Sequence, residues 1–146
     1  MKSKLVTEQS ELEQALALRM DVFVKEQGVA SDEEVDEYDE SPSACRHFLV
    51  TDEGEPVAAG RWKAFEPGVA KLQRIAVRLP YRGRSIGRLL VSAMEEDASA
   101  LGYDSAVLDA QCSAEPFYEK LGYTTISAEP FYDAGILHVR MSKALR

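Results

Sequence analysis

The feature that most constrains the fold of this 146-residue chain is the succession of three patterns between Val69 and Gly102. Residues 69–77 are rich in aliphatic side chains and predict a strand. A loop with glycine and arginine follows, and the apolar side chains at 86, 89, 90, 93 and 94 then recur at helical spacing. Gly102 is the residue type expected just after such a helix. The segment therefore predicts a strand, a tight loop and a helix over about 85–101.

The remaining patterns predict a mixed α/β fold. Ser10 followed by Glu13 is a capping box, which predicts that a helix begins near Ser10 and runs to about residue 24 or 25. Further strands are expected at 47–50, 57–65, 106–110, 123–126 and 136–141, and a short helix at 114–121. This order predicts a mixed sheet with helices on both faces. Since no repeat or linker divides the chain, we expect one domain over 1–146.

The loop after the predicted strand has the properties of a phosphate-binding site. The first turn of a helix exposes unpaired backbone N–H groups, and glycines allow that backbone to approach a phosphate closely. Arg82, Arg84 and Arg88 add cationic donors at the same place. The loop lacks the Lys-Ser/Thr ending of a P-loop and the dinucleotide pattern of glycines. Taken alone, it fits a pyrophosphate cradle and a tight turn with solvated arginines about equally well.

Two motifs resolve this ambiguity through a resemblance. Arg82-Gly83-Arg84-Ser85-Ile86-Gly87, preceded by Arg74-Ile75-Ala76-Val77, resembles the coenzyme-binding motif and fourth strand of the GNAT family of N-acetyltransferases. Ala114-Glu115-Pro116-Phe117-Tyr118-Glu119-Lys120-Leu121-Gly122-Tyr123 resembles the family's downstream signature. The resemblance covers most of the chain. It implies the acyl-CoA N-acyltransferase fold, with a central, mostly antiparallel sheet between helices, and acetyl-CoA as cosubstrate.

The resemblance also implies roles for individual residues. The backbone of Ile75, Ala76 and Val77 would pair with the pantetheine arm and polarise the thioester carbonyl. Tyr118 would protonate the departing thiolate. The loop that would hold the pyrophosphate consists of Arg82, Gly83, Arg84, Ser85, Ile86, Gly87 and Arg88. Ser85 replaces a family glycine, so a positive φ at this position would strain the loop.

The general base is not determined by the sequence. An alkylammonium has a pKa near 10.4, so an amine acceptor must lose a proton before it attacks a thioester. Glu26, His138 and His47 are the candidates. Glu26 follows the first predicted helix, where the family often builds its acceptor site. A lone histidine in a strand, such as His138, is more often structural.

The segment from Leu18 to Gln27 resembles the start of a bacterial GNAT subgroup, the YjcF- and ElaA-like proteins. Arg19 falls near the apolar stripe of the first helix, where an unpaired charge would be costly, so Asp36 or Asp39 is its expected partner. A surface position for Arg19 is the alternative. The acidic stretch that contains Glu34 also resembles acyl-homoserine-lactone synthases, which are longer and use acyl-carrier protein.

The composition of the chain limits the kinds of ligand and partner that we expect. A net charge of −8 argues against non-specific nucleic-acid binding and is compatible with a cationic acceptor. No apolar run is long enough for a membrane helix and no signal peptide is apparent, so we expect a cytoplasmic protein. Cys45 and Cys112 are expected to be free thiols, and no metal site is expected. The resemblance is compatible with a homodimer, and a non-catalytic CoA-binding regulatory module is the main alternative to an enzyme.

Overall fold

Eight strands form one sheet in a computed structural model that describes residues 1–146. The strands follow the order β1-β2-β3-β4-β5-β8-β6, and β7 pairs with β8 outside this path. Their bounds are β1 (Lys2–Leu5), β2 (Arg46–Asp52), β3 (Glu55–Glu66), β4 (Val69–Val77), β5 (Ser105–Gln111), β6 (Thr124–Thr125), β7 (Phe131–Asp133) and β8 (Ile136–Ala144). Only β4 and β5 run parallel, so the predicted mixed and mostly antiparallel sheet is confirmed.

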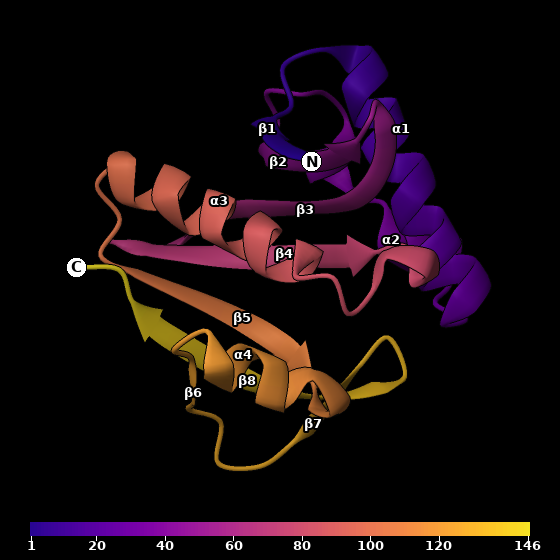
Figure 1. Cartoon of the computed structure of the whole chain (residues 1–146). Coiled ribbons are helices and arrows are strands. Elements are labelled where there is room, and N and C mark those ends of the chain that lie inside the picture. Colours follow the sequence, from indigo (N-terminus) through magenta and orange to yellow (C-terminus); the bar gives the residue numbers. More distant parts are fainter.

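The helices cover both faces of this sheet (Figure 1). The principal helices are α1 (Gln9–Arg19), the π-helix η1 (Met20–Glu26), α2 (Ser31–Glu34), α3 (Ile86–Ala100) and α4 (Glu115–Lys120). Single 3₁₀ turns lie at η2 (Glu37–Asp39), η3 (Leu79–Tyr81) and η4 (Cys112–Ala114). No helix combines the length and the apolar character that crossing a membrane requires.

Strand alternation creates two separate cores. In β3, Ala58 packs in the cluster that contains Leu90 of α3, whereas its neighbour Ala59 packs in the cluster that contains Leu12 and Leu18 of α1. Successive side chains of a strand point to opposite faces, so two adjacent buried residues of one strand pack in different cores. The predicted placement of helices on both faces is therefore confirmed.

The structure corrects two details of the predicted elements. The first helix is capped at Glu8 rather than Ser10, because the Glu11 carboxylate accepts hydrogen bonds from the backbone N–H groups of Thr7 and Glu8, both at 3.1 Å. The strand β7 was not predicted. It pairs with β8 through a hairpin with a two-residue turn. The turn residues Ala134 and Gly135 both have positive φ, as a type I′ turn requires.

Candidate active site

The parallel strands β4 and β5 separate before they end (Figure 1). They pair only from Val69 opposite Ser105 to Leu72 opposite Leu108, although β4 continues to Val77 and β5 to Gln111. Beyond Leu72, β4 therefore presents backbone N–H and C=O groups that have no partner strand on the β5 side. An extended ligand can pair with these groups in place of a strand.

A bulge in β4 marks the place where the two strands diverge. Ala59 of β3 pairs with Ala76 and Arg61 pairs with Gln73, so two residues of β4, Arg74 and Ile75, lie opposite one residue of β3. Arg74 has φ 56°, in the left-handed region. A bulge of this kind bends the strand that carries it, which turns the end of β4 away from β5.

A cavity of about 970 Å³ occupies the opening between the two strands. Its size suits a cofactor-sized ligand. The predicted site residues that line it are Ile75, Ala76, Val77, Arg82, Gly83, Ser85, Ile86, Gly87, Arg88, Tyr118 and His138. Arg84 and Glu26 do not line it. The guanidinium of Arg84 instead lies 5.2 Å from the centre of the Tyr81 ring.

The loop before α3 brings a helix N-terminus to this cavity. Gly83 and Ser85 both adopt left-handed conformations, with φ of 78° and 62°, and Ser85 is the residue that precedes the helix. The unpaired N–H groups of the first turn of α3 form an anion-binding end. Gly87 leaves little space for a side chain, because a Cβ atom would lie 3.1 Å from the Phe117 ring. The left-handed Ser85 costs about 1–2 kcal/mol relative to a relaxed conformation.

The arginines of the loop are used differently. Arg88 makes no ion pair within the chain and is available to an anion at the cavity. Arg82 donates from Nε to the carbonyl of Val77 at 2.9 Å and binds both carboxylate oxygens of Glu26, at 2.6 and 2.9 Å. The hydrogen bonds from Arg82 lower the pKa of Glu26. Glu26 therefore lies beside the predicted coenzyme loop as an ion-paired carboxylate.

Tyr118 is buried against two aromatic rings at the cavity wall. Its ring makes edge contacts with Phe117 and Tyr123 at centroid distances of 4.9 and 5.9 Å. Burial raises the pKa of Tyr118 well above that of a free phenol, so the hydroxyl keeps its proton at neutral pH. No group of the chain forms a hydrogen bond with that hydroxyl, whereas the Tyr123 hydroxyl donates to Glu95 at 2.7 Å. Of the two tyrosines, only Tyr118 has a hydroxyl free for a ligand.

The two histidines lie in different environments. His138 lines the cavity, and its Nδ1 lies 2.7 Å from the carbonyl oxygen of Ile136. A carbonyl can only accept, so Nδ1 carries the proton and the lone pair of neutral His138 is on Nε2. His47 is fully buried outside the cavity, where its Nε2 lies 2.7 Å from the Tyr38 carbonyl oxygen and burial lowers its pKa.

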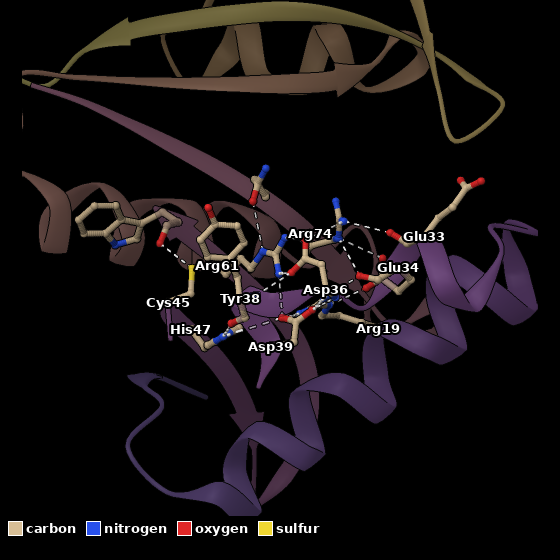
Figure 2. Close-up of polar contacts among 12 residues, drawn as sticks. Arg19, Glu33, Glu34, Asp36, Tyr38, Asp39, Cys45, His47, Arg61 and Arg74 are labelled. Atoms are coloured by element: carbon tan, nitrogen blue, oxygen red, sulfur yellow. Dashed lines mark hydrogen bonds and ion pairs between the residues drawn. The ribbon is translucent and has the colours of Figure 1, made fainter. Parts of the chain in front are cut away.

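A buried cluster of ion pairs joins α1 to the acidic stretch (Figure 2). Arg19 is 1% exposed, and it donates to Glu34 at 2.6 Å and to Asp39 at 2.8 Å. Asp39 is thus one of the two partners expected for Arg19, and the surface alternative is wrong. Asp36 pairs instead with Arg61, at 2.7 Å. Arg61 was not predicted to take part in this cluster, although an arginine among the apolar residues of β3 is a signal for a buried ion pair.

The same cluster changes how the acidic stretch can act. The carboxylates of Glu34, Asp36 and Asp39 are bound by arginines, so they are not free to attract a cationic acceptor. The remaining carboxylates of the stretch, at residues 32, 33, 37 and 40, are exposed. A general attraction of cations by this segment is therefore weaker than its composition suggests.

A sheet that opens at its single parallel pair, with an anion-binding helix end beside the opening, defines the acyl-CoA N-acyltransferase class. The family model described as acetyltransferase (GNAT) domain matches residues 8–145. The chain therefore belongs to the GNAT family and is an acyl-CoA-dependent acetyltransferase.

Individual relatives agree with this assignment. The chain is 39% identical to the uncharacterized N-acetyltransferase YjcF of Bacillus subtilis over 98% of its own length and 99% of that protein. The structure of Escherichia coli ElaA superposes with a TM-score of 0.84 at 26% identity, covering 97% of this chain and 98% of that one. An aminoglycoside 6′-N-acetyltransferase, solved with coenzyme A, shares the fold with a TM-score of 0.81 at 16% identity over 100% and 98% of the two chains.

Proposed function

We propose that this enzyme transfers an acetyl group from acetyl-CoA to a primary amine by direct attack in a ternary complex, with no covalent enzyme intermediate. The observation that carries the proposal is the opening between β4 and β5, where free backbone groups and the N-terminus of α3 line the same cavity. Acetyl-CoA supplies an activated thioester when it is bound. The chain's own residues bind it, exclude water and move protons.

The proposed binding residues divide by the part of the coenzyme that they contact. The backbone of Ile75, Ala76 and Val77 takes the place of a strand partner and holds the pantetheine arm. The first turn of α3, together with Arg88 and the loop that begins at Arg82, holds the diphosphate. The backbone contacts need only the geometry already described, which includes Ser85 in its left-handed conformation.

Proton transfer is assigned to two residues of the cavity wall. Tyr118 keeps its proton and has no partner in the chain, so it can donate to the departing thiolate. His138 is the better candidate for the base, because it lines the cavity and its lone pair is on Nε2. Glu26 is already bound by Arg82, and a carboxylate whose pKa is lowered is a weaker base.

Calorimetric titration with acetyl-CoA tests the proposal first. Micromolar binding, followed by thiol release with spermidine, kanamycin or a lysine peptide as amine probes, supports it. Binding without thiol release favours the regulatory-module alternative. A folded protein that binds no acetyl-CoA contradicts the proposal and favours another acyl donor, as in the acyl-homoserine-lactone synthases. Cytoplasmic localisation and a homodimer stay predictions, and light scattering tests the second.

A further inference from the structure

Arg74 is unusual because a long side chain occupies a left-handed position inside a strand. Its φ of 56° belongs to a region that favours glycine and that other residues rarely adopt. Backbone strain of this kind persists only where the surrounding structure enforces it. The side chain of Arg74 provides contacts that a glycine could not.

Those contacts reach the end of α2. The guanidinium of Arg74 donates to the backbone carbonyls of Glu34 at 3.1 Å and Glu33 at 3.2 Å, and it lies 3.3 Å from the Glu34 carboxylate (Figure 2). The carbonyls at a helix C-terminus have no partner within the helix, so a cation is favourable there. Arg74 thus fastens the short helix α2 to the bulge of β4.

The fastened segment is a wall of the candidate active site. Glu33, Glu34 and Arg74 all line the cavity, and the residues that follow Arg74 in the chain are Ile75, Ala76 and Val77. One residue therefore joins two parts of the site. Its backbone forms the bulge that opens the sheet, and its side chain links that bulge to α2, which Arg19 holds from the other side through Glu34.

We propose that Arg74 is a positioning residue for the transfer reaction, which holds α2 over the acyl end of the cavity so that the amine approaches in one orientation. This role rests on the proposed function. Arg19 and Arg61 lie deeper in the ion-pair cluster and bind Asp39 and Asp36 directly, so the cluster persists without Arg74. The fold is therefore expected to survive substitution of Arg74.

Three variants separate the two contributions of Arg74. Arg74→Gly removes the side chain but keeps the bulge, because glycine adopts positive φ freely. Arg74→Ala removes the side chain and also disfavours the bulge. Arg74→Lys keeps the charge, although a lysine cannot reproduce the fork of donors that an arginine presents. Glu53→Gly is the matched control, because Glu53 has φ 50° in the β2–β3 turn and does not line the cavity.

Amide hydrogen exchange of residues 31–36 and acetyl-CoA titration are the readouts that need no known acceptor. We expect Arg74→Gly to exchange these amides at least about 10-fold faster. Its affinity for acetyl-CoA should stay within about 3-fold of wild type, and Arg74→Ala should weaken that affinity further. With the amine probe that turns over fastest, the KM for the amine should rise about 10-fold in Arg74→Gly and recover partly in Arg74→Lys.

Unchanged exchange of residues 31–36 in Arg74→Gly overturns the proposal, and so does an amine KM equal to that of wild type. Glu53→Gly should alter neither. A wild-type protein that binds no acetyl-CoA overturns the proposed function and with it the positioning role. The exchange measurement then still decides whether Arg74 holds α2, so the two failures are distinguishable.

Discussion

Arg82 and Glu26 lie 56 residues apart in the sequence and form a two-pronged ion pair beside the coenzyme loop, with N–O distances of 2.6 and 2.9 Å. The pair connects the end of η1 to the loop that begins α3. Because each side chain is about one-third exposed, the pair is screened by water and is worth no more than about 1 kcal/mol. An incoming diphosphate can therefore compete with Glu26 for Arg82.

Glu26→Gln is expected to tighten acetyl-CoA binding by about 2- to 5-fold, because Arg82 is then free for the diphosphate. Calorimetry measures the change. The control is Asp21→Asn, which removes a similarly exposed ion pair with Arg78 at 2.7 Å, away from the cavity. Weaker binding in Glu26→Gln means that Glu26 positions Arg82. A loss of kcat near 100-fold at unchanged affinity would identify Glu26 as the base.

Tyr118→Phe is expected to lower kcat by about 100-fold and to leave the acetyl-CoA affinity within about 2-fold, because only the proton donor is removed. Steady-state thiol release measures the rate. Tyr123→Phe is the matched control, since the Tyr123 hydroxyl is already bound to Glu95 and its loss affects stability by about 1 kcal/mol. Equal rates in wild type and Tyr118→Phe would exclude Tyr118 as the acid.

His138→Gln tests the proposed base. We expect kcat to fall by about 100-fold at unchanged acetyl-CoA affinity, because glutamine has no basic nitrogen at the position of Nε2. His47→Gln is the control, since His47 is buried outside the cavity and its substitution should change the melting temperature but not the kcat of the folded protein. If His138→Gln turns over normally, proton removal belongs to another group or to water.

Ser85→Gly is expected to stabilise the protein by up to about 1 kcal/mol. The relief of a left-handed serine exceeds the greater entropy of an unfolded glycine, and Ser85 makes no capping hydrogen bond that would be lost. Ser85→Val should destabilise by more than about 1 kcal/mol. Thermal denaturation measures both, and Ser92→Gly within α3 should destabilise. A Ser85→Val variant that is more stable than the wild-type protein would contradict the backbone strain at Ser85.

The ion-pair cluster predicts an acid-sensitive stability. Burial alone would raise the pKa of Asp39, but the hydrogen bonds and charges of Arg19 and Arg61 outweigh it and hold this pKa at about 2. A carboxylate with a lowered pKa stabilises the fold above its ordinary pKa, so about 2 kcal/mol present at neutral pH should be lost as the pH falls from about 4 to about 2. Urea denaturation across this range measures the loss.

Two substitutions check the source of that stability. Asp39→Asn leaves two buried arginines without their shared anion, so it should cost about 3–5 kcal/mol at pH 7 and remove much of the dependence between pH 4 and 2. Glu34→Gln should cost less, because burial is the main influence on Glu34 and raises its pKa, which already disfavours its charge. Equal losses of stability in the two variants would contradict the assignment of this stability to Asp39. An unchanged loss of stability between pH 4 and 2 in Asp39→Asn would contradict it too.

Local patterns predicted the parts of the fold that depend on neighbouring residues. The strand β4 over Val69–Val77 and the helix α3 were predicted within one residue at each end, because aliphatic runs and helical periodicity are local signals. The cap of α1 was misplaced by two residues, since two overlapping pairs of capping residues occur there. The hairpin of β7 was missed because its strand has only three residues.

The sequence by itself determined the family and the loop and helix of the proposed coenzyme site, and it made Tyr118 the candidate acid, because these depend on residue types at fixed spacing. Only the tertiary structure decided where β4 leaves β5, which side chain binds Arg19, and that His138 rather than His47 lines the cavity. It also placed Glu26 on Arg82 and Arg74 on α2. The side-chain contacts among these relationships join residues 15 to 56 positions apart. Such contacts arise from tertiary packing, which local periodicity in the sequence does not encode.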